Sequence, residues 1–210
     1  TKDISEGDYS TRSSDKKEDE LGRISSALNK MAASLEKTFN DLNIHNWLQT
    51  GTVDLSNAMR GERDLHLLSE KLITSITGYI KAPIGTVYII DRDSNYKLRG
   101  GYAANNAPEK FASGEGLIGQ AVKSKKMIVL NNVPENYVRI ASSLGNTPPR
   151  HLVILPLLYG GECIAVIEVG LLKELSTVET EFLENNAEAI AIGINAALDY
   201  MKLQDFLEET

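Results

Sequence analysis

The residues that could carry out covalent chemistry in this 210-residue chain are few and lie far apart. Cys163 is the only cysteine, so the chain cannot form an internal disulfide, and a reducing compartment is expected. This cysteine begins the apolar run CIAVIEVG, and no neighbouring cation would lower the pKa of its thiol. We therefore predict that Cys163 is a buried structural cysteine.

Histidines could ligate a metal, but His45, His66 and His151 have no Cys, Asp or Glu neighbours at ligand spacing. We predict no metal site. His151 opens an apolar strand and could reach a binding pocket, although a hydrogen-bonded histidine at a strand end is the favoured interpretation. The sequence shows no pair of a nucleophile and a base, so we expect no catalytic activity from this region.

Two further stretches hold polar groups of interest. GEGLIGQ, residues 114–120, places two glycines before an expected helix, where free N–H groups could hold an anion. Glu115 stands between these glycines and would repel a phosphate, so a tight turn into the helix is favoured. Glu168 lies inside the apolar run CIAVIEVG, where a buried carboxylate must be paired, solvated or protonated.

The spacing of apolar residues predicts the elements that position these groups. One helical tract begins at Asp19 and Glu20 and ends at Arg60-Gly61, and Asp64 caps a second helix that closes before Pro83. After Pro83 the spacing of apolar residues is no longer that of a helix. It predicts strands at 85–91, 96–102, 127–131, 151–158 and 163–170, with a short helix near Leu117.

A capping box, Ser176-Thr177-Val178-Glu179, starts the last long helix. The strands are joined as hairpins, which implies an antiparallel sheet with helices packed against it. Two of these strands are apolar on both faces, so we expect both faces of the sheet to be covered. The fold class predicted from these elements is α+β.

The first helical tract carries an apolar stripe with steps of three and four residues. Its residues are Leu21, Ile24, Leu28, Met31, Leu35 and Leu42. This spacing allows two helices to interdigitate along a shared line, so the stripe predicts a dimer, the alternative being that it packs against the rest of its own chain. After Asn43 the apolar residues change phase to Ile44, Trp47, Leu48, Leu55 and Met59, which indicates a different packing partner.

The composition excludes several classes of function. The net charge of −7 and the pI near 5.1 offer no basic face for a nucleic acid. The N-terminal residues are polar throughout, so we predict no signal peptide, and no run of about 18 apolar residues predicts a membrane span. Because Thr1 is not an initiator residue, we expect the sequence to be a piece of a longer protein.

Two stretches resemble known families. DELGRISSALNKMA, residues 19–32, resembles the second helix of a HAMP domain, because DELG and NKM stand at the family's DExG and N-x-M positions. From about Trp47 to Tyr200 the chain resembles a GAF domain of the kind found in hybrid histidine kinases. The matching stretches are WLQTGTVDLSNAMRGERDL, GEGLIGQAV, VPENYVRIASSLGNTPPRHLVILPL and ECIAVIEVG.

The resemblance implies a GAF (PAS-like) antiparallel sheet with helices on both faces, preceded by a long signalling helix. It implies a partial HAMP helix at 1–43, a GAF domain with flanking helices at 44–205 and the start of a downstream linker at 206–210. The function implied is a non-catalytic sensory and dimerising relay of a bacterial two-component histidine kinase, the cytoplasmic portion of a plasma (inner) membrane protein. Its partners would be a second copy in a parallel homodimer and a kinase domain downstream in the same chain.

The resemblance also implies a site for a small-molecule ligand, which is the alternative function. The residues expected to line it are Tyr88, Tyr102, Phe111, Leu117, Tyr137, Ile140 and Leu144, with polar contacts from Ser142, Ser143, His151 and Glu168. Equally, the protein's own side chains could fill such a space. Some GAF domains bind a bilin through a cysteine, but Cys163 lies in a strand without a following His, so we expect no covalent bilin and no other cofactor. The signature of cyclic-nucleotide-binding GAF domains is not found.

Overall fold

The computed structural model describes residues 20–104, 106–133, 140–142 and 145–208, with backbone alone for residues 20, 21, 140–142, 145 and 146. The chain divides into two compact units, residues 1–50 and residues 51–210. The predicted boundary between residues 43 and 44 remains a prediction. Helix α2, Glu20–Met59, contributes residues to both units.

The described part of the first unit is helix α2 as far as Thr50. The whole helix contains no proline and only two glycines, Gly22 and Gly51, so no residue in it interrupts the hydrogen-bond ladder. It starts within one residue of the predicted position and ends just before Gly61, which takes a positive φ of 73°. None of the described helices is both long enough and apolar enough to cross a membrane.

The second unit holds a six-stranded sheet and three further helices. The helices are α3 (Leu65–Ile80), α4 (Gly116–Ser124) and α5 (Thr177–Glu208). The strands are β1 (Ile84–Ile90), β2 (Asn95–Tyr102), β3 (Lys110–Ala112), β4 (Ile128–Asn131), β7 (His151–Tyr159) and β8 (Glu162–Leu171). A separate two-stranded ribbon consists of β5 (Ile140–Ser142) and β6 (Gly145–Thr147).

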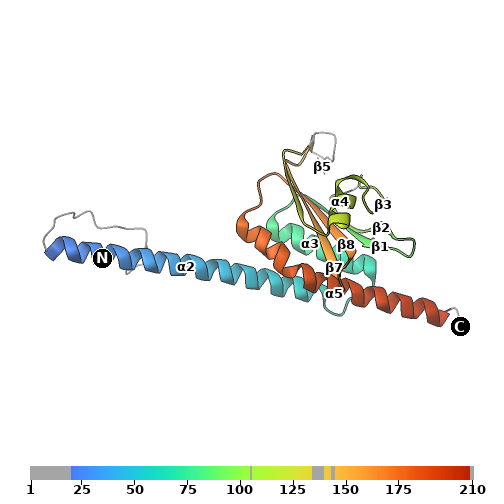
Figure 1. Cartoon of the computed structure of the whole chain (residues 1–210), viewed down its shortest axis with the longest axis horizontal. Helices are drawn as coiled ribbons and strands as arrows, with labels where there is room; N and C mark the ends of the chain where they lie inside the picture. Colours follow the sequence, from blue (N-terminus) through green and yellow to red (C-terminus); the bar gives the residue numbers. More distant parts are fainter. Residues whose placement is uncertain (1–19, 105, 134–139, 143–144, 209–210) are drawn as a thin grey trace. The chain divides into compact units, whose positions relative to one another are not determined.

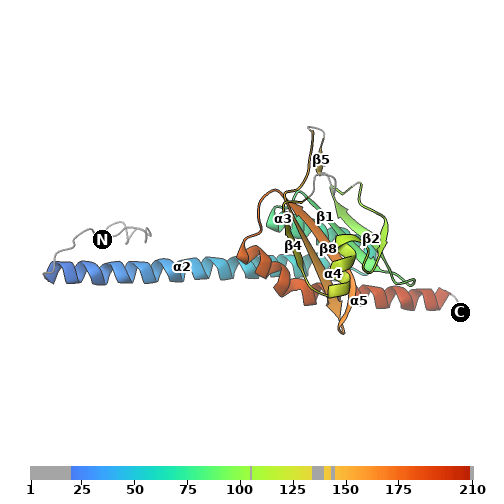
Figure 2. The ribbon, with the colours of Figure 1, turned by 45° about the horizontal axis from the view of Figure 1, so that its top comes forward.

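All strand pairs of the large sheet are antiparallel, and its strand order is β3-β2-β1-β8-β7-β4. Helices α3 and α5 cover one face, which we call the α3/α5 face, and α4 covers the other, the α4 face (Figures 1 and 2). The predicted α+β fold with an antiparallel sheet and helices on both faces is therefore confirmed.

Each face of the sheet carries its own buried layer. On the α3/α5 face, Val87 and Ile89 of β1 lie under helices whose inner side chains are almost fully buried, among them Leu72, Ile76, Phe182 and Ile190. On the α4 face, buried residues form a continuous cluster, which we call the α4-face cluster: Tyr88, Tyr96, Phe111, Ile118, Ala121, Val122, Val133, Leu152, Ile154, Cys163 and Val166.

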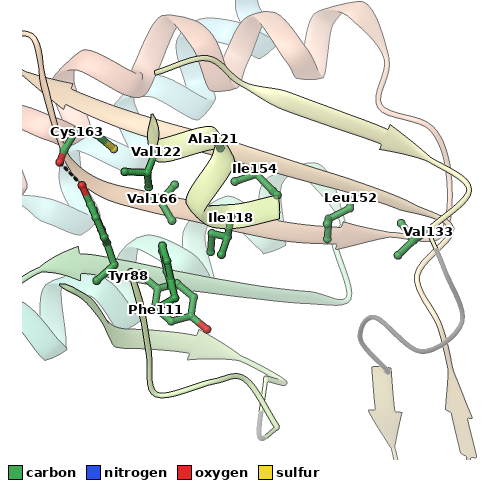
Figure 3. Packing of buried hydrophobic residues seen from close by; sticks show 11 residues of the cluster. Tyr88, Phe111, Ile118, Ala121, Val122, Val133, Leu152, Ile154, Cys163 and Val166 are labelled. Atoms are coloured by element: carbon green, nitrogen blue, oxygen red, sulfur yellow. Dashed lines mark hydrogen bonds between the residues drawn. The ribbon is translucent and has the colours of Figure 1, made fainter. Parts of the chain in front are cut away.

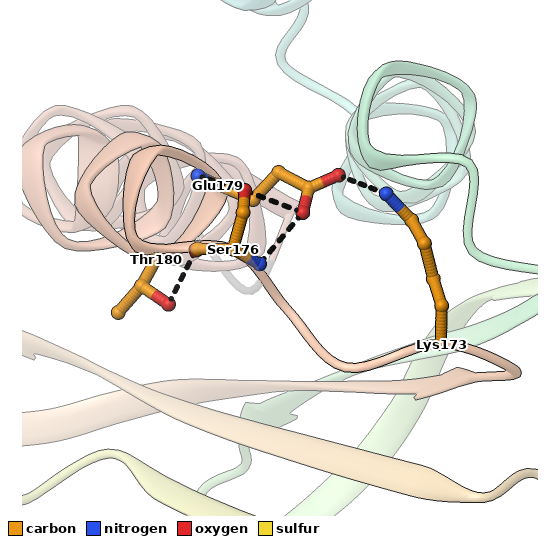
Figure 4. Close-up of polar contacts among 4 residues, drawn as sticks. All are labelled: Lys173, Ser176, Glu179 and Thr180. Atoms are coloured by element: carbon orange, nitrogen blue, oxygen red, sulfur yellow. Dashed lines mark hydrogen bonds and ion pairs between the residues drawn. The ribbon is translucent and has the colours of Figure 1, made fainter.

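Side-chain caps fix the starts of α3 and α5. The carboxylate of Asp64 accepts a hydrogen bond from the Leu67 amide at 2.8 Å, as the sequence predicts. At α5, the Glu179 carboxylate accepts from the Ser176 amide at 2.8 Å, while the Glu179 amide donates to the Ser176 hydroxyl at 3.2 Å (Figure 4). This reciprocal pair is the predicted capping box.

Two parts of the sheet were not expected from the sequence. Strand β3 lies in a stretch where the sequence predicts no strand, and its three residues pair with Asn95–Lys97. The ribbon of β5 and β6 lies between the predicted strands 127–131 and 151–158, where the sequence predicts no strand. Both elements are only three residues long, too short to show the alternation that identifies a strand.

Candidate functional site

The α4-face cluster is built around three aromatic side chains. Phe111 of β3 stacks on Tyr96 with ring centroids 5.2 Å apart and meets the Tyr88 ring edge-on at 4.9 Å. From α4, Ile118 and Val122 complete this packing (Figure 3). The cluster between α4 and the sheet is therefore packed from the protein's own side chains.

Both tyrosine hydroxyls in the cluster are hydrogen-bonded to backbone carbonyls. The Tyr88 hydroxyl donates to the Pro108 oxygen at 2.9 Å, and the Tyr96 hydroxyl donates to the Cys163 oxygen at 2.6 Å. Burial raises the pKa of both hydroxyls far above the usual value, and at Tyr88 the negative charge of Glu168 adds to the effect. These phenols are therefore neutral hydrogen-bond donors at physiological pH.

Next to the cluster, strands β1 and β8 present two polar side chains on the same face. Thr86 and Glu168 are directly paired across the two strands, and Glu168 is also paired with the cluster residue Ile154 on β7. Thr86 is only 5% exposed, and its hydroxyl has no hydrogen-bond partner among the described residues. Glu168 is half-buried. A hydroxyl and a carboxylate in this arrangement can bind N–H or O–H groups of a small ligand.

Only some of the residues predicted to line a ligand site meet at this face. Tyr88 and Phe111 belong to the cluster, Leu117 packs against it, and Glu168 lies beside it. Tyr137, Ser143 and Leu144 lie outside the described residues, as do the side chains of Ile140 and Ser142, whose backbone forms part of β5. The structure therefore brings together four of the predicted residues.

Tyr102 is placed on the opposite face from the predicted one. The pairing of β1 with β2 shifts by one residue between Val87 and Tyr88, so that Arg99 is an extra residue in β2. This bulge reverses the alternation of side chains, and Gly100, two residues before Tyr102, approaches Ser69 of α3. Tyr102 consequently lies on the α3/α5 face, 43% exposed, and does not contribute to a site with Tyr88.

His151 also lies away from the α4-face cluster. It alternates along β7 with Leu152, a cluster residue, and is therefore directed to the other face. Its Nδ1 is 2.9 Å from the Asn131 oxygen of the paired strand β4. His151 is thus the hydrogen-bonded strand-end histidine that the sequence analysis favours.

Cys163 is buried, as predicted, with 4% exposure. Its Sγ donates to the Ala165 oxygen at 3.2 Å, and burial raises the pKa of the thiol. A thiol of this kind is a poor nucleophile because the thiolate is disfavoured. The absence of a covalent bilin remains a prediction. Among the described residues, no group of three His, Cys, Asp or Glu side chains could hold a metal ion.

The two glycines at the start of α4 allow the turn that the sequence predicts. Gly114 and Gly116 have φ values of 87° and 61°, a region that favours glycine. Between them, the Glu115 carboxylate folds back on the turn and accepts a hydrogen bond from the Ala112 amide at 2.9 Å. A carboxylate held at this helix start opposes the binding of an anion.

The apolar stripe predicted on the first helix, from Leu21 to Leu42, lies on α2 and is called here the α2 stripe. It is largely exposed to solvent. Ile24 and Met31 are each 60% exposed, Leu42 is 53% exposed and Leu35 is 41% exposed. Leu28 is half-buried, and the side chain of Leu21 lies outside the described residues. An apolar line of this length on a surface helix marks a surface for association.

Sequence reasoning did not find Thr86 or Tyr96. Thr86 lies within GTVYIID, where a threonine is an ordinary strand residue, and it is distinguished only by the lack of a hydrogen-bond partner among the residues that the structure describes. Tyr96 opens the second strand of a predicted hairpin, and its contact with the Cys163 backbone joins residues 67 positions apart. A contact between such distant positions leaves no local signal in one sequence.

Comparisons with known proteins match two domain families. A GAF domain family model matches residues 62–195, and a HAMP domain family model matches residues 1–37. Residues 1–19 of the second match lie outside the described part of the chain. A comparison of the sequence with curated proteins gives no match.

Solved structures with a similar fold come from proteins of different kinds. The chain is similar to a GAF domain of a phosphoenolpyruvate-protein phosphotransferase from Acinetobacter, with a TM-score of 0.62 and 15% identity over 74% of this chain and 97% of that one. It is also similar to free methionine-R-sulfoxide reductase from Neisseria meningitidis, with a TM-score of 0.61 and 16% identity over 73% of this chain and 91% of that one. A third similar structure is a fragment of a methyl-accepting chemotaxis protein, with a TM-score of 0.55 and 12% identity over 68% of this chain and 96% of that one. At these identities the likeness shows the fold alone.

Proposed function

The chain belongs to the GAF domain family and carries a HAMP domain match before it, and on this basis we propose that it is the dimerising relay of a bacterial two-component histidine kinase. The two domains together make it a sensory region of signal transduction. In the proposed parent protein, this region is the cytoplasmic portion, with the plasma (inner) membrane before it and a kinase domain after it.

The exposed α2 stripe is the single observation that carries this proposal. Its apolar side chains repeat at the a and d spacing, and four of them are between 41% and 60% exposed. In a parallel homodimer, the same side chains from two copies would interdigitate and become buried from solvent. Much of the stripe lies within the residues that the HAMP model matches, up to Leu35.

The strength of such a dimer can be bounded. Burying the exposed part of one Leu, Ile or Met side chain contributes about 1 kcal/mol, and the stripe supplies about five such residues per helix. Association costs about 4–15 kcal/mol in lost freedom of motion. We therefore expect this 210-residue chain to form a weak dimer, which tethering of both copies to a membrane would strengthen through effective concentration.

A weak helical pairing is suited to relaying a signal, because two packings of similar energy can interconvert. An input that favours one crossing angle or register of the α2 pair would change the population of the two packings. The phase change after Asn43 gives α2 a second set of apolar residues, of which Leu55 is 1% exposed in the second unit. One helix thus carries both a pairing surface and a surface packed in the GAF unit.

Charge substitution on the stripe tests the dimer. Ile24→Asp combined with Met31→Asp places four like charges on the pairing line of a dimer, and we expect only monomers in sedimentation equilibrium. Ala33→Asp adds a charge to the same helix at an exposed position off the stripe, and it should leave the association constant unchanged. The proposal fails if the unaltered chain is monomeric at all concentrations, or if the stripe variant dimerises like the control.

A second candidate function, binding of a small ligand as the signal, is favoured by Thr86. Among the described residues the buried Thr86 hydroxyl has no hydrogen-bond partner. A hydroxyl left in this state costs about 1–3 kcal/mol, and a ligand with N–H or O–H groups beside Glu168 would remove that cost. Native mass spectrometry of the chain purified from cells would detect such a ligand as added non-covalent mass. Thr86→Val should abolish that mass; if no mass is found and Thr86→Val only stabilises the fold, this function is excluded.

We do not propose a catalytic role. The similar sulfoxide reductase shares the fold at 16% identity. This chain has one cysteine, whose thiol pKa is raised by burial, so it cannot form a dithiol.

A further inference from the structure

Helix α2 enters the second unit at a buried glycine. Gly51 is the first residue of that unit, and the helix contains neither proline nor glycine between Ile24 and Thr50. A glycine inside a helix makes the helix less stable than an alanine would, because its backbone loses more freedom on folding. The contacts that surround Gly51 account for this residue.

Two aromatic rings occupy the space that a side chain of residue 51 would need. A Cβ at Gly51 would lie 2.3 Å from Cε1 of Tyr79 on α3 and 2.7 Å from Cε2 of Phe182 on α5. The centres of these two rings are 4.9 Å apart, and their planes are inclined by 38°. The bare backbone of α2 therefore lies against two rings that belong to two different helices.

Both rings are held close to Gly51. Phe182 is almost fully buried, so its ring cannot turn into solvent. The hydroxyl of Tyr79 forms a hydrogen bond with the Gly51 backbone, which lowers the pKa of this hydroxyl and partly offsets the increase caused by burial. A displacement of α2 at Gly51 must therefore displace both rings.

Beyond Gly51, α2 continues beside α5 and in the same direction. A Cβ at Gly193 of α5 would lie 3.5 Å from Sδ of Met59, so the contact between the two helices moves toward higher residue numbers on both. Leu55, between the two contacts, is almost fully buried. Its enclosed side chain fixes α2 at this level, whereas Gly51 has no side chain that the unit could enclose.

A helix contact without a side chain resists movement less than a contact with an enclosed side chain. Side chains that interlock between helices hold each helix in one position, because each lies in a gap between neighbouring side chains. Gly51 stands one turn, about 6 Å, before Leu55. A small tilt of α2 about Leu55 therefore shifts Gly51 across the rings without drawing a side chain out of such a gap.

We infer that Gly51 is a positioning residue of the relay, because it allows α2 to tilt about Leu55 and the tilt displaces the ring of Phe182 on α5. The inference rests on the proposed dimer, since a change of packing along the α2 stripe is the input that tilts the helix. The uninterrupted helix carries the tilt to Gly51, and Phe182 carries it to α5. The contact at Gly51 is thus the step that joins the two helices.

The response of α5 is expected in the turns that follow Phe182. The start of α5 is fixed by the capping box of Ser176 and Glu179. Asn186, one turn after Phe182, is buried and donates a hydrogen bond to the Phe182 carbonyl oxygen at 2.8 Å. A displaced Phe182 alters the backbone hydrogen bonds of these turns, so the amides of residues 182–190 should exchange hydrogen at a different rate.

Hydrogen exchange with the α2 stripe locked tests the inference. Met31→Cys places a thiol on the stripe, and mild oxidation links two copies there through a disulfide, while Cys163 stays buried. The reduced form is studied at a concentration at which it is monomeric. We expect the exchange rates of residues 182–190 to differ about fivefold or more between the oxidised and reduced forms. A residue with a merely structural role would shift exchange equally in both forms and leave this ratio unchanged.

Gly51→Ala in the Met31→Cys chain fills the space between α2 and the rings. The added methyl gives α2 a side chain enclosed by Tyr79 and Phe182, and the ratio between the two forms should fall below about twofold. Asn57→Ala is the matched control, because Asn57 is an exposed residue of the same helix and the change also favours the helical state. The control should keep the full ratio.

Gly51→Ala combined with Tyr79→Leu keeps the test valid if the alanine alone prevents folding. Leucine lacks the ring atoms that lie nearest to residue 51, so the methyl has room. The methyl still lies against Phe182, and the ratio should again be reduced.

The outcomes separate this inference from the proposed dimer. Failure of residue 31 to cross-link would overturn the dimer and, with it, the inference. Cross-linking without a change of exchange at residues 182–190 would overturn the inference and leave the dimer standing. A full ratio in either folded Gly51→Ala variant would also overturn it, as would an equal loss in Asn57→Ala.

Discussion

The guanidinium carbon of Arg63 lies 4.7 Å from the centre of the Tyr200 ring, and this contact joins the connection between α2 and α3 to the second half of α5. A cation placed over an aromatic ring at this distance is attracted by the electrons of the ring face. Residues after Leu198 are less buried than the first half of α5. Contacts such as this one therefore contribute much of the stability of the C-terminal end of α5.

Loss of the aromatic ring should loosen the end of α5. Tyr200→Leu removes the cation–π contact, which contributes about 0.5–1 kcal/mol at an exposed site. We expect faster hydrogen exchange of the backbone amides of residues 199–208. Tyr200→Phe keeps the ring but not the hydroxyl, and its exchange should stay close to that of the unaltered chain. Equal exchange in both variants would contradict this role of the ring.

The buried tyrosines should make the fold sensitive to alkali. The pKa values of the Tyr88 and Tyr96 hydroxyls are raised by burial, whereas in the unfolded chain tyrosine ionises near pH 10. Above that pH the unfolded state binds fewer protons than the folded state, so the free energy of unfolding decreases as pH rises. The expected slope is about 1.4 kcal/mol per pH unit for each tyrosine.

Denaturant titrations at pH values from 8 to 11.5 would measure this decrease. Tyr96→Phe should reduce the slope above pH 10 by about half, while costing about 1 kcal/mol at neutral pH for the lost hydrogen bond to Cys163. Tyr159→Phe removes a tyrosine that is 45% exposed and serves as the control. A slope unaffected by Tyr96→Phe would show that this hydroxyl ionises normally in the folded protein.

Glu179 should contribute to stability at neutral pH and lose that contribution in acid. Burial on its own raises the pKa of this carboxyl, but the hydrogen bonds from Lys173 and Ser176 outweigh it and hold the pKa below the usual value (Figure 4). Because the folded-state pKa is lowered, the stabilisation is present above the unfolded-state value near 4.3 and is lost as pH falls through the folded-state pKa.

Glu179→Gln should lower the free energy of unfolding by about 1–2 kcal/mol at pH 7, since the capping box and the ion pair are both weakened. The difference between the variant and the unaltered chain should shrink as the pH approaches 3. Thermal unfolding followed by circular dichroism across this range measures it. A difference that stays constant with pH would mean that the charge of Glu179 is unimportant.

Gly100 should not tolerate a side chain. A Cβ at this position would lie 2.5 Å from the Ser69 carbonyl carbon and 2.7 Å from its oxygen, both backbone atoms of α3. Gly100→Ala would therefore force α3 away from β2. We expect the free energy of unfolding to fall by about 2 kcal/mol or more, as is typical of overpacked cores. Gly78→Ala on the same helix meets no atom within 4 Å and should stabilise the fold by about 0.5–1 kcal/mol. Urea denaturation of both variants would show a decrease in the free energy of unfolding for Gly100→Ala and an increase for Gly78→Ala.

The sequence predicted those features that depend on neighbouring residues. Asp64 and the Ser176–Glu179 box are local signals, in which a side chain and its backbone partner are three residues apart, and both helix starts were predicted from them. The hairpin of β7 and β8 was likewise predicted from two apolar runs and the turn between them. The antiparallel sheet and its two covered faces followed from these elements.

The candidate site was predicted less completely, because its geometry depends on pairing between strands. Tyr102 was expected to line the same site as Tyr88, but the bulge at Arg99 places it on the other face of the sheet. Thr86 became notable only when its hydroxyl was seen to lack a partner among the described residues. Nothing local in the sequence specifies a bulge at Arg99 or an unpaired buried hydroxyl.

The extra residue in β2 has a consequence for how this domain can vary between relatives. Removing Arg99 would leave Leu98 opposite Tyr88 and Gly100 opposite Val87, so Gly100 would still face the backbone of α3 and Tyr102 would keep its side of the sheet. A one-residue deletion at Arg99 thus removes the bulge without exchanging the two faces, whereas a deletion in the regularly paired part of β2 would exchange them. In a family alignment, one-residue gaps should therefore fall at this point of the hairpin more often than elsewhere in the strand.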